Sequence, residues 1–119
     1  MKGGTIGKHL LIDFFGVDCN LLNDVDLLRS TLQLAGSSGG LTAVEAPVLH
    51  PFEGGGVTGF LLLAESHISF HTYPEFGFIA LDIFACGKAD PYAALEVFRV
   101  ALNPQHEITN AVERGTQSI

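Results

Sequence analysis

The stretch AESHISFHTYPE at residues 64–75, followed by FIALDIFA at residues 78–85, decides the predicted fold. Ile68 and Phe70 in the first segment, and Ile79, Leu81 and Ile83 in the second, recur at every second residue, which is the pattern of a strand with one buried face. The short turn at residues 74–77 should join the two strands as a hairpin with a four-residue loop. This register pairs three sets of residues: Tyr73 with Phe78, His71 with Ala80, and His67 with Phe84.

The alternation also assigns the side chains of this hairpin to two faces. The apolar set should lie under helices and comprises Ile68, Phe70, Ile79, Leu81 and Ile83. The opposite set is polar and aromatic and comprises His67, Ser69, His71, Tyr73, Asp82, Phe84 and Cys86. This second face is too polar for a core and too aromatic for plain contact with solvent. We therefore expect it to carry a site, an interface, or both.

The rest of the chain predicts four more strands and two helices. Strands are expected at residues 8–15, 41–49, 57–64 and 105–112. The tail after the last of these should be loose. One helix should begin with Asn23 as its N-cap and stop at the glycines of residues 36–40. The other should begin at Asp90-Pro91 and run to Leu102.

Two helices can cover only one face of a sheet of five or six strands. The predicted fold is therefore α+β, with residues 1–119 forming a single domain. It should be a two-layer α/β sandwich in which a largely antiparallel sheet carries the helices on one face. The other face is then left for an active site and a dimer interface.

Two groups of polar residues should lie at opposite ends of the strands. Ser66 should lie beside Cys86, because the hairpin register brings those two strand ends together. His71 lies five residues further along, roughly 16 Å away at about 3.3 Å per residue. It should belong to a second group, which also holds Thr58, Glu75 and Phe52. A two-fold axis perpendicular to the strands would bring the two groups together, so we expect a site shared by two subunits.

The strand at residues 57–64 should reach its neighbour through a tight turn at Glu65-Ser66, with Ala64 paired to His67. That register would pair two further sets of residues: Thr58 with Tyr73, and Phe60 with His71.

Composition excludes several classes of function. The net charge is −7 and the six basic residues are scattered, which argues against nucleic acid as a partner. The longest unbroken apolar stretch, residues 60–64, is far too short for a membrane span, and residues 1–7 lack the layout of a signal peptide. Two cysteines allow no disulfide framework and no four-cysteine metal site, so we expect a reducing, cytoplasmic setting and no metal. Four residues are expected to be structural or surface residues: His9, His50, His106 and, as a small buried hydrophobic residue, Cys19.

Several short motifs together resemble the prokaryotic S-adenosylmethionine decarboxylase proenzymes, which cleave themselves and depend on a pyruvoyl group. The resemblance covers nearly the whole chain. Its motifs are GKHL at residues 7–10, LHPF at 49–52, GVTG at 56–59, the block at 64–75, LDIFACG at 81–87 and the helix start at Asp90-Pro91. The serine block combined with the later cysteine is the specific part of this pattern.

The resemblance implies that the chain is cut between Glu65 and Ser66, giving a β fragment of residues 1–65 and an α fragment of residues 66–119. Ser66 would become the pyruvoyl cofactor, whose ketone forms a Schiff base with the substrate amine. His71 and Thr58 match the processing residues of the family. Cys86 matches the residue that returns a proton to the substrate. The resemblance further implies an (αβ)2 dimer that converts S-adenosylmethionine to its decarboxylated form and CO2 for spermidine synthesis.

On the substrate side, the resemblance implies that Phe52 stacks on adenine and Glu75 binds the ribose hydroxyls, with His67 also at the substrate. Three departures from the family pattern concern this side of the site and are candidate substrate contacts: Glu53, Asp13 and Tyr73. A carboxylate at Glu53 could meet a cationic tail, so L-ornithine or L-arginine is an alternative substrate. A second alternative is an unprocessed homologue that binds a ligand without catalysis.

Overall fold

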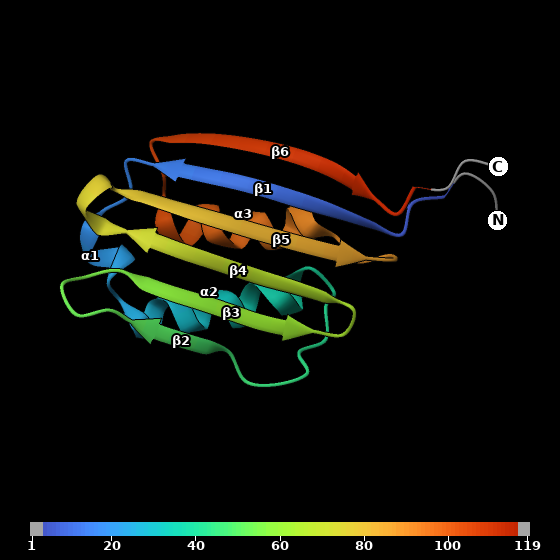
Figure 1. The fold of residues 1–119 in the computed structure, drawn as a ribbon, viewed down its shortest axis with the longest axis horizontal. Helices are drawn as coiled ribbons and strands as arrows, with labels where there is room; N and C mark the ends of the chain where they lie inside the picture. Colours follow the sequence, from blue (N-terminus) through green and yellow to red (C-terminus); the bar gives the residue numbers. More distant parts are fainter. Residues whose placement is uncertain (1–3, 117–119) are drawn as a thin grey trace.

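The chain folds into one six-stranded sheet with its helices on one face (Figure 1). The structure is a computed structural model that describes residues 4–116. In chain order the elements are β1 (Gly7–Phe15), α1 (Cys19–Leu22), α2 (Val25–Ser38), β2 (Val48–Pro51), β3 (Val57–Leu63), β4 (Ser66–Tyr73), the 3-10 turn η1 (Pro74–Phe76), β5 (Phe78–Cys86), α3 (Pro91–Leu102) and β6 (His106–Arg114). The strand order is β2-β3-β4-β5-β1-β6 and every neighbouring pair is antiparallel. This confirms the predicted α+β sandwich.

The core lies between the sheet and the two long helices α2 and α3. All five residues expected under the helices are buried: Ile68, Phe70, Ile79, Leu81 and Ile83. They pack with apolar residues that recur at helical spacing, among them Leu28, Leu32 and Ala35 of α2 and Leu95, Phe98 and Leu102 of α3. The alternation of the strands therefore leaves the opposite face of the sheet uncovered in this chain, and we refer to it as the open face.

The first hairpin has the predicted register, with Tyr73 opposite Phe78 and His67 opposite Phe84. The second hairpin differs from the prediction by one residue in its turn. Leu63 pairs with Ser66, so the turn consists of the two residues between them rather than Glu65-Ser66. As a result Thr58 lies opposite His71 rather than Tyr73, and Phe60 lies opposite Ser69 rather than His71. The physical reason is the left-handed backbone of Glu65, which has φ of 61° and completes the turn before the serine.

The start of α2 also differs from the prediction. Its N-cap is Asp24, whose carboxylate accepts a hydrogen bond from the Leu27 amide at 3.0 Å. Asn23 instead ends the short helix α1, which the sequence analysis missed because it is a single turn. The Asn23 side chain accepts a hydrogen bond from the amide of Gly56, 33 residues away, at 2.9 Å. The predicted cap at Asp90 is confirmed, since its carboxylate accepts from the Tyr92 and Ala93 amides.

The strand expected at residues 41–49 is wrong for most of its length. Residues 41–47 reach the sheet only through an isolated bridge from Ala43 to Leu63, and β2 begins at Val48. Pro47 has no amide hydrogen to donate to a neighbouring strand, so regular pairing can start only after it.

Two smaller predictions are also wrong. The last strand continues past Val112, because Glu113 and Arg114 pair with β1. Cys19 is exposed rather than buried, since it starts the first turn of α1 on the surface.

Candidate active site

The first candidate group lies where β3 turns into β4 and where β5 ends. Ser66 is 6% exposed, and its Oγ accepts a hydrogen bond from the Cys86 amide at 3.1 Å. The Cys86 thiol donates to the carbonyl oxygen of Glu65 at 2.8 Å. The structure therefore brings Ser66 and Cys86 together, as predicted, and places both on the Glu65-Ser66 peptide bond. A hydroxyl next to a carbonyl whose oxygen is hydrogen bonded is an arrangement that suits acyl transfer.

The backbone of this turn is held in an unfavourable conformation. Glu65 is one of two described residues other than glycine with positive φ, and such a conformation costs about 1–2 kcal/mol for an L-residue. The residue before it is fixed from outside the hairpin, because the Ala64 amide donates to the carbonyl of Thr42 at 2.9 Å. The segment that failed to form a regular strand thus restrains the turn at which cleavage is expected.

These residues fit the pyruvoyl group that the family resemblance implies. Such a group derives from a serine that follows the cut peptide bond, and Ser66 presents a buried side chain directly after the strained turn. A cavity of about 300 Å³ adjoins this turn and is lined by Glu65, Cys86 and the segments at residues 40–42 and 87–89. Small molecules can therefore approach the bond from that side.

The second candidate group lies at the other end of β4. Thr58 Oγ1 and His71 Nδ1 are 2.8 Å apart and form a hydrogen bond between adjacent strands. A cavity of about 390 Å³ opens beside this pair, within the usual size range of small-ligand sites. Its lining brings together the four residues predicted for this end, Phe52, Thr58, His71 and Glu75, and also Tyr73, which was a candidate substrate contact.

The Phe52 ring is 52% exposed and lies edge-on to His50, with their ring centroids 4.6 Å apart. An exposed aromatic ring beside a cavity is available for stacking on a flat ligand. The structure does not bring Glu53 or Asp13 to this cavity. Glu53 is exposed on the β2–β3 loop. Asp13 lies on β1, opposite Ala80 of β5, and β1 is two strands away from β4.

The two groups do not meet within one chain. His71 lies five positions after Ser66 along one continuous strand, which corresponds to roughly 16 Å. β4 is hydrogen bonded to β3 on one side and to β5 on the other along this length, so it cannot fold back to close the distance.

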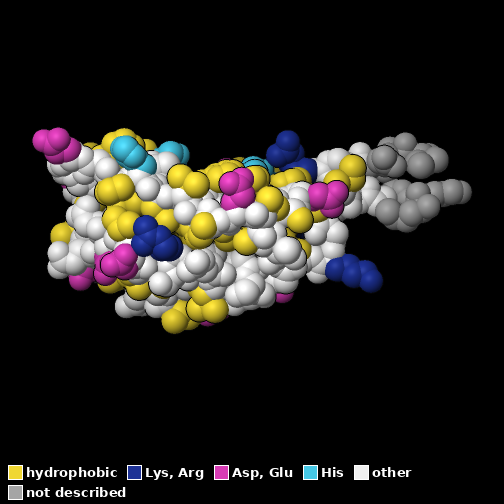
Figure 2. Space-filling model, turned by 90° about the horizontal axis from the view of Figure 1, so that it is seen from below, with side chains coloured by type: hydrophobic (Ala, Val, Ile, Leu, Met, Phe, Trp, Pro, Cys, Tyr) yellow, Lys and Arg dark blue, Asp and Glu magenta, His cyan; other side chains and the backbone are white. Residues whose placement is uncertain are grey.

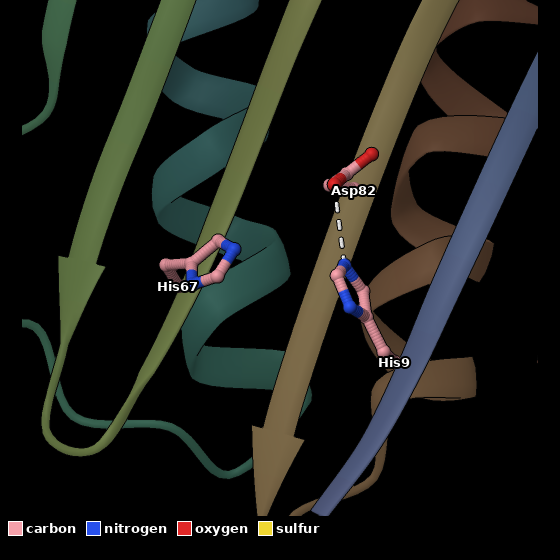
Figure 3. Close-up of side chains that lie close together, drawn as sticks. All are labelled: His9, His67 and Asp82. Carbon is pink, nitrogen blue, oxygen red and sulfur yellow. Dashed lines mark hydrogen bonds and ion pairs between the residues drawn. The ribbon is translucent and has the colours of Figure 1, made fainter. Parts of the chain in front are cut away.

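A third group, which was not predicted from the sequence, lies on the open face and is formed by His9, His67 and Asp82 from three adjacent strands (Figure 3). His9 Nε2 lies 3.2 Å from Asp82 Oδ2, and Arg114 Nη1 lies 3.1 Å from His9 Nδ1. A guanidinium can only donate, so His9 Nδ1 accepts and Nε2 carries the hydrogen that is donated to Asp82. This group needs the β1–β5 register, which pairs His9 with Phe84 and which the sequence did not reveal.

His67 is the member of this group next to Ser66 in the chain. Burial, followed by the nearby His9, lowers the pKa of His67, while Asp82 acts in the opposite direction. His67 is therefore held neutral at neutral pH. Its ring lies between those of Phe60 and Phe84, with centroids 5.9 and 5.8 Å away.

Within residues 4–116, His9, His67 and Asp82 are the group whose donor atoms lie close enough together to hold a metal ion, all within 4.8 Å of one another. Both nitrogens of His9 already have partners, however, and one of these partners is the cation Arg114. A metal ion would have to replace the proton on Nε2 beside that positive charge. The contacts thus favour a hydrogen-bonded network of Arg114, His9 and Asp82 over a metal site. The other two histidines, His50 and His106, are exposed.

None of the helices described between residues 4 and 116 has the length and apolar character needed to span a membrane.

Comparison with known proteins identifies the family. The family model described as S-adenosylmethionine decarboxylase matches residues 8–115. The chain is 39% identical to an S-adenosylmethionine decarboxylase proenzyme of Prochlorococcus marinus, over 93% of this chain and 89% of that protein. It is 37% identical to one of Brevibacillus brevis, over 97% of this chain and 86% of that protein. The crystal structure of the adenosylmethionine decarboxylase from Aquifex aeolicus matches with a TM-score of 0.86 and 36% identity, covering 97% of this chain and 93% of that one. The chain belongs to the S-adenosylmethionine decarboxylase family.

Proposed function

We propose that this chain is the proenzyme of a pyruvoyl-dependent decarboxylase that converts S-adenosylmethionine to decarboxylated S-adenosylmethionine and CO2, for use in spermidine synthesis. Membership of the family supports the activity. The observation that carries the proposal is the pair of contacts at the Glu65-Ser66 bond: the Cys86 amide on the serine hydroxyl and the Cys86 thiol on the glutamate carbonyl.

Self-cleavage would begin with attack of Ser66 Oγ on the carbonyl carbon of Glu65, which converts the amide into an ester. Negative charge develops on the Glu65 oxygen in this step, and the Cys86 thiol is in position to donate a hydrogen bond to it. The left-handed backbone of Glu65 raises the energy of the uncut bond and favours the step.

Loss of the Ser66 Cα proton then breaks the ester C–O bond and leaves Glu65 with a terminal carboxylate. The enamine left at residue 66 is hydrolysed to a pyruvoyl group with release of ammonia. When formed, this group supplies an electron-withdrawing carbonyl that accepts the electron pair left by departing CO2. Cys86 would act as the general acid that returns a proton to the substrate carbon. The neutral, partly buried ring of His67 would form an adjoining wall of the site.

Recognition of S-adenosylmethionine would use the second group of residues, with Phe52 stacked on adenine and Glu75 on the ribose hydroxyls. Thr58 and His71 would support processing, and Tyr73 would line the same cavity. Since these residues lie at the far end of β4, the complete site is proposed to need two subunits in an (αβ)2 dimer.

The open face supports such a dimer. Six of its apolar side chains are at least 38% exposed: Leu11, Val48, Phe60, Leu62, Ile108 and Val112. Figure 2 shows hydrophobic side chains together with histidines along this side of the molecule. A patch of this composition is typical of a surface that a second copy covers. We place the enzyme in the cytoplasm, where unpaired thiols such as Cys86 stay reduced.

The comparisons give no support to ornithine or arginine as substrate, and Glu53, the residue that motivated this alternative, does not line the cavity. The alternative of an unprocessed binding protein predicts one full-length species for the purified wild-type chain.

Intact-mass analysis tests the proposal directly. We expect two fragments from the wild type, of 65 and 119 − 65 = 54 residues. Ser66→Ala should stay whole because it lacks the attacking oxygen, whereas Ser69→Ala on the same strand should be cut normally. Release of CO2 from S-adenosylmethionine, ornithine and arginine, measured separately, tests the substrate. A wild-type chain that stays whole, or one that is silent on S-adenosylmethionine alone, contradicts the proposal.

A further inference from the structure

The loop between β2 and β3 contains Gly54, Gly55 and Gly56 in succession, with φ of 91°, 112° and 96°. Glycine adopts this region easily but loses more conformational freedom on ordering than any other residue. A run of three glycines is therefore expected to take many conformations unless contacts from elsewhere in the chain restrain it. This loop forms part of the cavity at Phe52, so its conformation determines the shape of that cavity.

Two side chains from distant parts of the chain hold the end of the loop. The Asn23 Oδ1 accepts a hydrogen bond from the Gly56 amide at 2.9 Å. The Thr72 hydroxyl accepts from the next amide, that of Val57, at 2.8 Å and donates to the Leu22 carbonyl at 2.7 Å. Both restraints therefore connect the loop to the corner between α1 and α2.

The restraint at Gly56 extends to Phe52 through the backbone. The Phe52 amide donates to the Gly56 carbonyl at 2.9 Å, and the Gly55 amide donates to the Phe52 carbonyl at 3.1 Å. A short chain of hydrogen bonds thus links the Asn23 side chain to the backbone that carries the Phe52 ring. The ring itself is half exposed, so its packing alone does not hold it in position.

We propose that Asn23 is a positioning residue for substrate binding, which holds the glycine loop so that the Phe52 ring is placed to stack on the adenine of the substrate. This inference rests on the proposed function, because that function supplies the adenine. Asn23 does not line the cavity, so it acts through the loop rather than on the substrate.

Two substitutions separate this role from a general effect on folding. Asn23→Ala removes both side-chain hydrogen bonds: the one from Gly56 and the one that Asn23 Nδ2 donates to the Cys19 carbonyl at 3.3 Å. Asn23→Asp keeps the oxygen that accepts from Gly56 and loses only the donor to Cys19. Both variants therefore lose the contact with Cys19, and they differ in the oxygen that accepts from Gly56 and in the negative charge of the aspartate.

We expect Asn23→Ala to raise the KM for S-adenosylmethionine about tenfold, the effect of losing one such hydrogen bond. The kcat should stay within about twofold of the wild-type value, and cleavage into two fragments should remain complete, because the Asn23 side chain is hydrogen bonded to Gly56 and Cys19 and not to the groups proposed for cleavage and catalysis. Asn23→Asp should restore most of the wild-type KM. Hydrogen exchange of the peptide covering residues 52–57 should be faster in Asn23→Ala than in Asn23→Asp.

Three outcomes would overturn the inference. The first is an unchanged KM in Asn23→Ala despite faster exchange of the loop, since a restrained loop would then not matter for binding. The second is no rescue by Asn23→Asp. The third is a parallel loss of cleavage, kcat and thermal stability, which is the result expected from a purely structural residue. Failure of the proposed function is distinguishable, because the wild type itself would then release no CO2 while the exchange measurement would still report on the Asn23 restraint.

Discussion

Replacing Cys86 by alanine tests the chemistry of the cut bond most directly. The substitution removes the thiol that donates to the Glu65 carbonyl at 2.8 Å. It leaves the backbone amide of residue 86, which donates to the Ser66 hydroxyl at 3.1 Å, so the orientation of the nucleophile is retained. Any change in the rate of cleavage can therefore be assigned to the contact with the carbonyl oxygen.

The expected magnitude follows from what such a donor contributes. Removing one strong donor to a developing oxyanion slows acyl transfer by about 100- to 1,000-fold. A thiol is a weaker donor than an amide, so we expect Cys86→Ala to be cut about 10- to 100-fold more slowly than the wild type. At about 1.4 kcal/mol per factor of ten, this corresponds to roughly 1.4–2.8 kcal/mol of lost stabilisation. Cys86→Ser keeps a donor, but its shorter C–O bond carries that donor less far toward the carbonyl oxygen, so it should lie between alanine and the wild type.

The assay is a time course of intact mass on protein isolated soon after synthesis, which follows the full-length chain and its two fragments. Cys19→Ala is the matched control, because Cys19 is the other cysteine and is exposed on α1. It should be cut at the wild-type rate. If Cys86→Ala were also cut at that rate, the thiol would have no part in stabilising the attacked carbonyl, and the reasoning from the 2.8 Å contact would be refuted.

Two further predictions concern stability and its dependence on pH. Burial lowers the pKa of His67, so as the pH falls the unfolded chain takes up a proton at this residue before the folded chain does. The free energy of unfolding should therefore fall as the pH drops below about 6.5, the ordinary pKa of histidine. In urea unfolding between pH 8 and 5, the free energy of unfolding should fall less for His67→Phe than for the wild type. The control His106→Gln, at an exposed site, should behave as the wild type. An equal fall in the free energy of unfolding for all three proteins would contradict the assignment to His67. Arg99 on α3 binds Glu107 on β6 through two hydrogen bonds of 2.7 and 2.8 Å, which lower the pKa of Glu107. Glu107→Gln should therefore lower the free energy of unfolding by about 1 kcal/mol above pH 5, a modest loss because Arg99 is partly screened by solvent. This difference from the wild type should vanish as the pH falls through the pKa of Glu107 in the folded protein. Glu96→Gln, which removes a more exposed partner of Arg99 at 3.3 Å, should cost less, and an equal cost for both would refute the ranking.

The sequence predicted those features that depend on local pattern. The hairpin of β4 and β5 has a turn of defined length. Its register, which pairs Tyr73 with Phe78 and His67 with Phe84, therefore followed from counting residues outward from the turn. The buried set under the helices followed from strand alternation, and the start of α3 followed from Asp90-Pro91, whose cap and proline leave little choice of helix origin.

The errors occurred where a distant contact decides between two local alternatives. Asn23 and Asp24 are both good N-caps, and the Gly56 amide draws the asparagine side chain away from α2. The turn before Ser66 could be placed at either of two adjacent positions. The left-handed backbone at Glu65, a conformation that the sequence gives no reason to expect of a glutamate, selects one of them.

The third group on the open face shows the same limit for the candidate site. His9 comes within reach of Asp82 and His67 only when β1 is placed beside β5. These two strands are more than 60 residues apart in the chain, and no turn length sets their register. Arg114 adds a further strand, since it reaches His9 from β6. Residues on sequential hairpins could therefore be placed together from the sequence, whereas residues joined by long connections could not.

The distribution of side chains on the open face bears on how a complete site can form. Polar groups lie at its two ends: Cys86 at one, where it contacts the inward-facing Ser66, and Thr58 with His71 at the other. The apolar residues Phe60 and Leu62 lie between them on β3. Motion within one chain cannot close this gap, because every strand between the two ends is hydrogen bonded along its length. A second copy related by a two-fold axis would cover the apolar centre. It would also bring the Cys86 end of each chain against the Thr58 and His71 end of the other chain. Burial of the centre would thus supply the energy of association, and every dimer formed in this way would contain two sites.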